Sequence, residues 1–316
     1  MKKLEMLIYE NWNHFIPTGK SWANGLQRNN HSVAVPAAGT IKTGFFKIDE
    51  LMKFDVIVDF EFDSFDYVEH LNELSEYKKK YPETIIVAIV LKYKNEYSKF
   101  NGVIDYWASL VSEYPSEKIK FEENNLKYIY VPLAGDELLF NKLEIPFINF
   151  DFSFVGQFGG HGHGYRGEDW YLYPLLNMAN LTNYVAGFTY KQYQAKYLQH
   201  SNLNVVYNSA KINLNFHYDV EKGEVDDRFD FNSRTFEIAL SGNFQLCDHP
   251  LCKNIFGESF VIASKENWIS TFMKYLDNST ERQRIAFEVQ KIALEKHTWK
   301  VRMNEFLKLI GSPQDE

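Results

Sequence analysis

Short apolar runs alternate with amphipathic stretches along the first half of the chain. Runs of about four to eight apolar residues are typical of strands buried in a parallel sheet, whereas apolar residues that recur every three or four positions predict helices. The pattern predicts strands at residues 4–9, 31–36, 54–60, 84–90 and 128–132. It predicts helices at residues 21–29 and 67–80, and a further strand and helix within residues 101–113. This order is typical of a doubly wound sheet, whose ligands bind at the carboxyl ends of its strands.

The second half of the chain repeats the alternation. The pattern predicts a strand at residues 152–158, a helix at residues 169–179, and short strands or strand–turn elements at residues 185–188, 204–207 and 211–216. Two C-terminal helices, one from Asn278 through Ala293 and one over residues 299–310, are predicted because their apolar residues fall on one face. At 316 residues the chain is long enough for two domains of ordinary size.

The segment D-F-N-S-R-T-F-E-I-A-L-S-G-N-F-Q-L-C-D, residues 230–248, predicts a helix followed by a strand. Asn232 or Ser233 is expected to cap the helix, because their side chains accept hydrogen bonds from N–H groups of a first turn. Gly242 tolerates the left-handed conformation that ends a helix. The segment F-Q-L-C, residues 244–247, then predicts a short, partly buried strand.

The first turn of this helix is a candidate anion site. A helix N-terminus offers unpaired amides and a partial positive charge, and both attract phosphate. Arg234 stands in the first turn, where a cation opposes the helix dipole, so its placement favours a role in holding an anion. Glu237 follows one turn later on the same face and is a candidate acceptor for the hydroxyls of a ribose. Together these residues predict a site for a nucleoside diphosphate.

The letters R-T-F-E-I-A-L-S-G-N-F-Q-L-C-D resemble the donor-binding signature of two-domain (GT-B) glycosyltransferases. The resemblance is closest to the glycosyl transferases group 1 branch that includes the spore maturation protein CgeB, in which Arg-x-x-Glu opens the helix and a glycine closes it. The flanks agree, with Y-N-S-A-K-I-N-L-N-F at residues 207–216 and E-K-H-T-W-K-V-R-M at residues 295–303. The resemblance covers roughly the second half of the chain well. In the first half it extends only to the general order of the predicted elements.

This resemblance implies an α/β protein of the GT-B fold, in which two Rossmann-like domains face each other across a cleft. It implies an acceptor-side domain at residues 1–140, a donor domain at residues 141–298, and a C-terminal helix at residues 299–316 that crosses back to the first domain. Residues 131–147 look like the linker between the two domains of these enzymes.

The resemblance also implies roles for the residues of the signature. Glu237 would hold the donor ribose, and Arg234 with the neighbouring amides of Ser233 and Thr235 would hold the diphosphate. Retaining enzymes of the wider group carry an acid eight positions before this glutamate, where this chain has Phe229. Whether the sugar keeps its configuration is therefore left open.

The glycine-rich segment G-Q-F-G-G-H-G-H-G-Y-R-G, residues 156–167, is a second candidate donor contact. Closely spaced glycines let a backbone approach a ligand, which makes Gly156 a candidate. Arg166 is a candidate for the phosphates, because the resembled enzymes commonly carry an arginine after this strand. His161 and His163 raise the alternative of zinc, but the sequence shows no third ligand. A solvated loop is the commoner explanation of these histidines, and we expect no metal site.

Residues 18–21 read T-G-K-S, like the end of a phosphate-binding P-loop. That motif needs a glycine where this chain has His14, so the phosphate cradle is incomplete. The segment instead resembles the loop after the first strand of GT-B enzymes, which makes Gly19 and Lys20 candidates for contact with the donor diphosphate. His14 is a candidate acceptor-side base, with a surface role as the alternative.

Two asparagines upstream of the signature helix are further donor candidates. Asn208 and Asn213 belong to the flank at residues 207–216, and strand alternation places Asn213 on the same face as Asn215. The resembled family places this strand just before the donor-binding loop, and pairing with local backbone is the alternative. The acidic residues from Asp59 to Glu69 are expected to form a solvated rim, with an acceptor-binding lip as the alternative.

Composition narrows the classes of partner. The net charge is −8 and the pI about 5.7, which argues against binding nucleic acid and allows at most peripheral membrane contact. The two cysteines, Cys247 and Cys252, provide neither a disulfide framework nor a zinc quartet. The N-terminal apolar run is too short and too charged for a signal peptide. We therefore expect a cytoplasmic protein with reduced thiols.

The sequence thus predicts a metal-independent glycosyltransferase, of the hexosyltransferase type, that uses no cofactor. A UDP-sugar is the expected donor, with GDP- and dTDP-sugars as alternatives, and the acceptor is a glycan, lipid, protein or small molecule that the sequence does not specify. Arg234, Arg166 and Lys20 would stabilise the leaving diphosphate. A catalytically silent sugar-nucleotide-binding or scaffold protein, and a sugar-nucleotide epimerase of the same fold, are the competing hypotheses.

Overall fold

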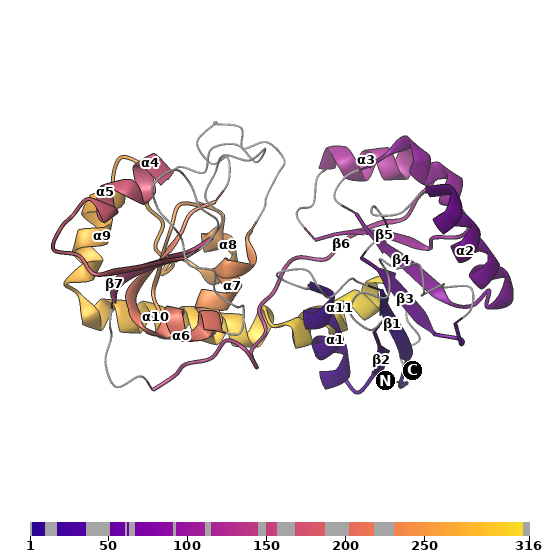
Figure 1. The fold of residues 1–316 in the computed structure, drawn as a ribbon, viewed down its shortest axis with the longest axis horizontal. Coiled ribbons are helices and arrows are strands. Elements are labelled where there is room, and N and C mark those ends of the chain that lie inside the picture. Colours follow the sequence, from indigo (N-terminus) through magenta and orange to yellow (C-terminus); the bar gives the residue numbers. More distant parts are fainter. Residues whose placement is uncertain are drawn as a thin grey trace. The chain divides into compact units, whose positions relative to one another are not determined.

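The computed structural model of the protein describes residues 2–9, 18–35, 51–60, 62, 67–90, 93–110, 115–144, 150–156, 168–186, 202–217 and 231–311. These residues form two compact units. The first unit holds the described residues up to Leu133 and those from Trp299 onward, and the second holds those from Ala134 to Thr298. As predicted, each unit is a parallel sheet flanked by helices (Figure 1).

The first unit is built on a six-stranded sheet in the order β2-β1-β3-β4-β5-β6, with every neighbouring pair parallel. Its strands are β1 (Glu5–Tyr9), β2 (Ser32–Ala34), β3 (Val56–Asp59), β4 (Ile85–Ile89), β5 (Tyr106–Ser109) and β6 (Tyr128–Tyr130). Its helices are α1 (Thr18–Arg28), α2 (Tyr67–Lys80), a short 3-10 helix (Asn95–Phe100), α3 (Pro115–Glu123) and α11 (Trp299–Leu309).

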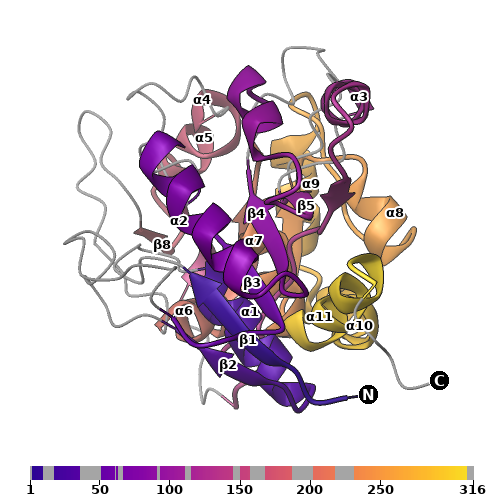
Figure 2. The same cartoon turned by 90° about the vertical axis from the view of Figure 1, so that its right-hand side faces the viewer.

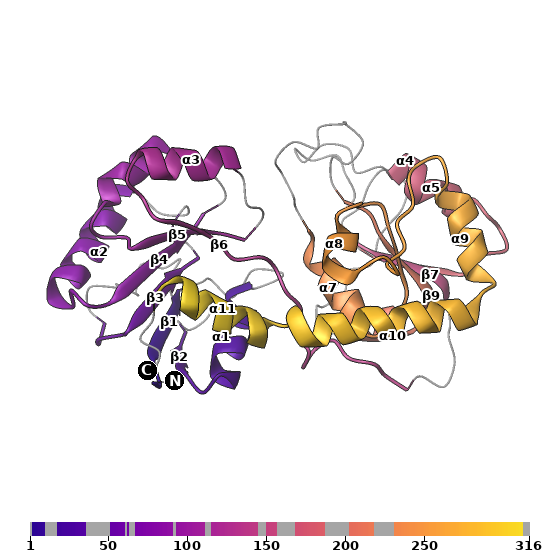
Figure 3. The ribbon, with the colours of Figure 1, turned by 180° about the vertical axis from the view of Figure 1, so that it is seen from behind.

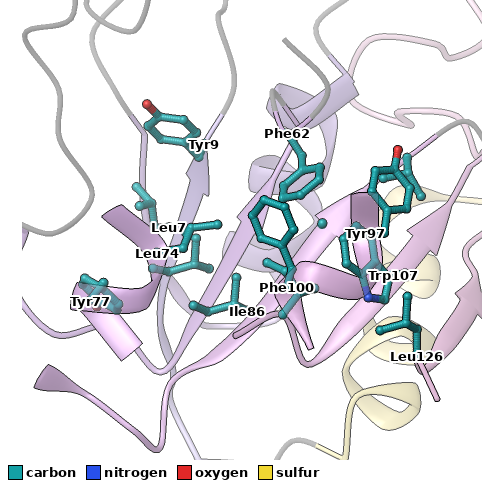
Figure 4. Packing of buried hydrophobic residues seen from close by; sticks show 14 of the residues in the cluster. Leu7, Tyr9, Phe62, Leu74, Tyr77, Ile86, Tyr97, Phe100, Trp107 and Leu126 are labelled. Carbon is teal, nitrogen blue, oxygen red and sulfur yellow. The ribbon is translucent and has the colours of Figure 1, made fainter. Parts of the chain in front are cut away.

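One face of this sheet carries a core of aromatic and branched side chains (Figure 4). Helix α2, which Figure 2 shows beside β3 and β4, contributes the buried Leu74 and Tyr77 to it. Toward β5 the ring of Tyr97 stacks on that of Trp107, with centroids 4.4 Å apart. Strands that are buried on both faces appear in a sequence as continuous apolar runs, which is why these strands were predictable.

Helices α1 and α11 pack against each other on the opposite face of the first sheet (Figures 1 and 3). The ring of Trp22 lies between those of Phe60, Trp299 and Phe306, with centroid separations of 5.3, 6.2 and 4.8 Å. Gly25 permits this close approach, because a Cβ atom there would lie 2.6 Å from the carbonyl oxygen of Trp299. The last helix therefore completes the core of the first unit.

The second unit is built on a four-stranded parallel sheet in the order β10-β9-β7-β8. Its strands are β7 (Phe150–Val155), β8 (Asn183–Ala186), β9 (Ala210–Asn215) and β10 (Gln245–Cys247). Its helices are α4 (Glu168–Tyr171), α5 (Tyr173–Leu176), α6 (Leu203–Asn208), α7 (Ser233–Leu240), α8 (Cys252–Phe256), α9 (Trp268–Leu276) and α10 (Ser279–Lys296).

The two faces of the second sheet differ in polarity. Strand register places Ser153 of β7, Asn213 of β9 and Gln245 of β10 in one row across the sheet. This row contacts α6 and α7 through hydrogen bonds to their backbone carbonyls. On the opposite face the rings of Phe154 and Phe216 stack 4.3 Å apart. A buried polar row of this kind persists only where its members are hydrogen-bonded.

The strand or strand–turn element predicted at residues 204–207 is wrong, because these residues form helix α6. Val205, Val206 and Tyr207 favour a strand by local propensity. Side-chain hydrogen bonds outweigh that propensity: Asn208 Nδ2 donates to the carbonyl oxygen of Asn204 at 2.8 Å, and Asn208 Oδ1 accepts from the Leu143 amide at 3.0 Å.

Two other helices differ from the expectation. The helix predicted over residues 169–179 is divided into α4 and α5, because Pro174 in the first turn of α5 has no N–H to continue a helical ladder. The helix expected within residues 101–113 begins instead at Pro115, a residue suited to a first helical turn. In the part of the chain that the structure describes, no helix combines the length and apolar character needed to cross a membrane.

Candidate functional site

The signature segment forms the helix that its sequence predicts. Asn232 caps α7, and its side-chain oxygen accepts a hydrogen bond from the Thr235 amide at 3.1 Å. Gly242 follows the helix with φ of 65°, the left-handed conformation expected of the residue that ends it. Helix α7 lies between β9 and β10 in the chain, so its N-terminus stands at the carboxyl end of the parallel sheet.

Arg234 is buried, with 7% of its surface exposed, and it holds the ends of two strands together. Its Nη1 donates to the Val155 carbonyl at the end of β7, and its Nη2 donates to the Phe216 carbonyl, just after β9, at 3.1 Å. Its Nε donates to Asn215 Oδ1 at 3.2 Å. The guanidinium also lies over the ring of Phe154, 4.9 Å from its centroid. This side chain thus places a positive charge at the carboxyl edge of the sheet.

Gly156 is required beside this arginine. A Cβ atom at Gly156 would collide with Arg234 Nη1. The amide of Gly156 continues the sheet by donating to the Ala186 carbonyl at 3.0 Å. The structure therefore brings together Gly156 and Arg234, two of the residues that the sequence analysis proposed separately.

Glu237 lies one helical turn after Arg234 and is also buried, with 4% of its surface exposed. Its Oε2 accepts a hydrogen bond from the hydroxyl of Tyr207 on α6 at 3.2 Å. Burial, together with the Glu237 charge, raises the pKa of Tyr207 well above its ordinary value, so the hydroxyl stays protonated and donates to the carboxylate. A carboxylate has room for about four hydrogen bonds, and Tyr207 fixes its orientation with one of them.

Thr235 links the first turn of α7 to the polar face of the sheet. Its hydroxyl donates to Asn232 Oδ1 at 3.2 Å and accepts from Asn215 Nδ2 at 3.0 Å. Its carbonyl oxygen accepts from Gln245 Nε2 at 3.0 Å. The amide of Thr235 is already bonded to the Asn232 cap. Thr235 therefore holds the first turn of α7 against the sheet through its hydroxyl and its carbonyl oxygen. Ser233, the first residue of the helix, is half-buried.

The two asparagines proposed from the sequence occupy different places. Asn213 lies in the sheet, where its Oδ1 accepts from Ser153 Oγ at 2.6 Å and its Nδ2 donates to the Tyr207 and Phe244 carbonyls at 3.2 Å each. The side chain of Asn208 bonds α6 to the segment around residues 141–143. Asn213 therefore belongs to the polar face beside α7, and Asn208 joins α6 to the segment that precedes β7.

The remaining candidates lie either in the first unit or outside the described residues. Gly19 and Lys20 lie in the first unit, in the first turn of α1 rather than in a loop, Gly19 buried and Lys20 exposed. His14 and Arg166 lie outside the described residues, as do His161 and His163.

A cluster of thiols and imidazoles beside α7 was not anticipated from the sequence. His217, just after β9, lies next to Cys247 and Asp248 at the end of β10, and Cys252 at the start of α8 completes the group. The parallel pairing of Cys247 with Asn215 brings these residues together. The signal was the pair Cys247 and Cys252, but nothing in the spacing points to a histidine thirty positions upstream of Cys247.

Burial and close neighbours shift the pKa values of this cluster. Burial lowers the pKa of His217, but Cys247 and the hydrogen bond to the Asp248 carboxylate outweigh it and raise this pKa to about 9. Burial, with the neighbouring His217, lowers the pKa of His249 to about 4. Burial raises the pKa of the Cys247 thiol well above its usual value. The ring centroids of His217 and His249 lie 4.9 Å apart.

In the first unit a buried carboxylate and a buried imidazole meet at the end of a strand. Asp59, the last residue of β3, lies with its Oδ2 2.6 Å from His70 Nε2 of α2, and both side chains are buried. The expectation of a solvated rim is therefore wrong for Asp59. The side chains of the acidic residues between Phe62 and Glu69 lie outside the described part of the chain.

Comparison with protein families gives one match, to a family described as glycosyl transferase-like, over residues 149–308. This range includes the whole second sheet, α7 and the cluster beside it. A comparison with curated proteins finds no match.

Solved structures share the fold over almost the whole chain. An α-glucosyltransferase in complex with UDP and a 13-mer DNA is 9% identical, with a TM-score of 0.68 over 99% of this chain and 100% of that one. The HepE protein of Anabaena, in complex with UDP-glucose, is 9% identical with a TM-score of 0.56, covering 98% and 100%. Sucrose-phosphate synthase of Thermosynechococcus elongatus is 9% identical with a TM-score of 0.56, covering 98% of each chain. These likenesses confirm the predicted GT-B fold class.

Proposed function

The chain belongs to the glycosyl transferase-like family, and from this premise we propose that it transfers a sugar from a nucleoside-diphosphate sugar to an acceptor hydroxyl. The observation that carries the proposal is the pair of buried side chains, Arg234 and Glu237, one turn apart on α7 at the carboxyl edge of the second sheet. Ligands of parallel α/β sheets bind at this edge.

Arg234 and the N-terminus of α7 form the proposed diphosphate site. During transfer, negative charge builds up on the leaving diphosphate, and fixed positive groups that already face it are an effective form of catalysis. The bonds from Arg234 to the Val155 and Phe216 carbonyls hold the guanidinium at the strand ends before any ligand arrives. Since the protein itself supplies this charge, we propose that the diphosphate needs no metal ion.

Glu237 forms the proposed ribose site. The Tyr207 hydroxyl orients its carboxylate, and a ribose diol offers two donors to the same group. The UDP and UDP-glucose in similar structures favour a UDP-sugar over GDP- and dTDP-sugars as donor.

Four residues complete the proposal. Lys20 and Arg166 are proposed as further positive groups for the diphosphate, Gly19 as a backbone contact to it, and His14 as the base that takes the acceptor proton. Membership of the branch that includes the spore maturation protein CgeB stays a prediction. So does an acceptor that is a glycan, lipid, protein or small molecule.

Isothermal calorimetry with UDP tests the ribose site. Glu237→Gln keeps the shape of the side chain but removes its charge, so we expect UDP affinity to fall about 10- to 100-fold, the loss of one or two hydrogen bonds to a charged group. Glu295→Gln, at an exposed position on α10, is the matched control and should bind UDP like the wild type. Circular dichroism checks that both variants are folded. Unchanged UDP affinity in Glu237→Gln would refute the assignment.

Turnover tests the proposed chemistry. The protein is incubated with UDP-sugars and a panel of acceptors, and release of UDP is compared with formation of a glycosylated product. Glycosylated product supports the proposal. UDP binding with no turnover on any acceptor favours a silent binding protein, and a changed sugar nucleotide formed without acceptor favours an epimerase.

A further inference from the structure

The cluster beside α7 has the composition of a metal site. His217, Cys247 and Cys252 each present one ligand atom, and these atoms all lie within 4.8 Å of one another. The two cysteine side chains are fully buried, and His217 is 5% exposed. The residues come from three segments, the end of β9, the end of β10 and the start of α8. The site therefore joins parts of the chain that are otherwise linked only through the sheet edge.

The distances suit tetrahedral coordination. The Sγ atoms of Cys247 and Cys252 lie 3.6 Å apart, and Cys247 Sγ lies 3.9 Å from His217 Nδ1. Zinc bonds of about 2.3 Å to sulfur and about 2.0–2.1 Å to nitrogen place two sulfurs about 3.8 Å apart, and a sulfur and a nitrogen about 3.6 Å apart. These two separations differ from the zinc values by a few tenths of an ångström, and all three ligand atoms lie within 4.8 Å of one another. A shift of the side chains toward a common centre would bring the three atoms to bonding distance of one ion.

The hydrogen bonds around His217 point its Nδ1 atom toward this centre. Its Nε2 lies 3.2 Å from the Thr235 hydroxyl, which itself donates to Asn232, so Nε2 is the donor. A metal-bound histidine usually donates its other ring N–H in this way. Nδ1 lies 2.9 Å from Asp248 Oδ1. Between an acceptor nitrogen and a carboxylate oxygen at this distance there must be a proton or a cation.

Asp248 and His249 support the same centre. Both carboxylate oxygens of Asp248 accept from the His217 amide at 3.0 Å, which fixes the carboxylate beside Nδ1. The His249 amide donates to Cys247 Sγ at 3.4 Å, a bond that favours the thiolate. Asp248 is 4% exposed, and a buried carboxylate needs a positive group beside it, which is either a protonated His217 or a bound metal ion.

We propose that His217 Nδ1 and the Cys247 and Cys252 thiolates bind a zinc ion, with the Asp248 carboxylate beside Nδ1. Two thiolates and an imidazole select zinc over Mg²⁺, Ca²⁺ and Mn²⁺, which prefer oxygen ligands. Binding releases the protons of both thiols and of Nδ1. These three residues leave a fourth position, which the Asp248 carboxylate or a water molecule would fill. The ion clamps β9, β10 and α8, and through Thr235 it steadies the first turn of α7.

Metal analysis and cobalt spectroscopy test the site. We expect about one zinc per chain in protein purified without chelators, and a thiolate-to-cobalt charge-transfer band after the zinc is exchanged for Co²⁺. The chain has only two cysteines, so any such band must come from Cys247 and Cys252. Wild-type protein that is stripped of metal, remains folded and gives no band with Co²⁺ would overturn the proposal, as would a disulfide between the two cysteines in freshly purified protein.

Variants separate this site from other histidines. Cys252→Ser and His217→Gln should lose the zinc and the cobalt band, whereas His31→Asn in the first unit and the double variant His161→Ala/His163→Ala should keep both. Thr235→Val, which removes the hydroxyl that orients His217, should lower zinc affinity about 10- to 100-fold. Full zinc occupancy in Cys252→Ser contradicts the proposal. If Cys252→Ser does not fold, protection of the wild-type thiols from a thiol reagent by added Zn²⁺ gives the same answer, and no protection overturns it.

Discussion

The two parallel sheets of this protein differ in what covers them. The first sheet is apolar on both faces, with Leu7, Ile57 and Ile86 facing α2 and Ile8 and Val58 among the buried residues of the sheet. The second sheet is aromatic on one face and polar on the other. An apolar face contributes stability through burial alone. A polar buried face adds little stability, and in the second sheet it lies beside α7, which carries the proposed donor site.

The polar face of the second sheet is stable because its buried side chains form hydrogen bonds with one another and with nearby backbone. Ser153, Asn213 and Gln245 each hydrogen-bond a neighbouring side chain or carbonyl, and Asn215 joins Gln245 to Thr235. A fully bonded network in a dry interior is rigid, whereas the loss of one member leaves the others unpaired. The comparison therefore predicts that substitutions in the second sheet change ligand binding and stability together, and that substitutions in the first change stability alone.

Removal of the buried arginine should have the largest effect. Arg234→Met leaves the Val155 and Phe216 carbonyls without their donor, so we expect a loss of about 2–5 kcal/mol from the stability of the second unit, together with loss of UDP binding. Arg282→Met is the matched control, because Arg282 is also buried and bonds the Tyr275 and Leu276 carbonyls far along the chain from α7. Denaturant unfolding gives the stabilities, and calorimetry on folded protein gives the UDP affinities. Equal UDP affinities in the two variants would break the comparison.

A cavity in the first core should change stability without changing ligand affinity. Leu74→Ala removes a fully buried side chain from between α2 and the first sheet, and should cost about 2–5 kcal/mol. Leu309→Ala, at a position on α11 that is 49% exposed, should stay within about 0.5 kcal/mol of the wild type. Hydrogen exchange assigns the loss to the first unit, and the folded protein should bind UDP normally. Weaker UDP binding by Leu74→Ala would contradict the prediction that substitutions in the first sheet change stability alone.

A smaller change at the strand edge should depend on Arg234. Gly156→Ala places a methyl group against Arg234 Nη1, and overpacking of this kind costs about 1–3 kcal/mol. In the Arg234→Met background the collision is absent, so the same substitution should cost less. A double-mutant cycle measures the difference. Equal costs in the two backgrounds would show that Gly156 acts through something other than the guanidinium.

The difference between the two sheets also explains which elements could be predicted from the sequence. Strands of the first sheet were predictable because burial on both faces leaves continuous apolar runs such as V-I-V in β3. Helix α7 was predictable from Asn232, a cap whose chemistry is local. The prediction failed at α6. There β-branched residues favour a strand, but the side chain of Asn208 accepts a hydrogen bond from the Leu143 amide, which is distant in the sequence.

The site was only partly predictable for a similar reason. Arg234 and Glu237 were identified from their spacing, but the bonds of Arg234 to Val155 and Phe216 depend on how three strands are aligned. The cluster around Cys247 depends on the parallel register of β9 and β10, which spacing does not reveal. Contacts that arise from strand pairing are long-range in sequence, so they appear only once the sheet is assembled.

The smallest predicted effect is a pH dependence confined to the first unit. His31 is buried, and its Nδ1 accepts the Leu4 amide at 3.2 Å, a bond that needs the neutral ring. Burial, with the nearby N-terminal charge, lowers the pKa of His31 below its usual 6.5. The unfolded chain therefore binds a proton more readily than the folded one, and the first unit should lose stability as the pH falls below about 6.5, until the folded histidine is also protonated. His31→Asn should remove this part of the pH dependence when unfolding is followed in urea. An unchanged pH profile in that variant would assign the acid sensitivity to another group of the first unit, with the buried Asp59–His70 pair the next to test.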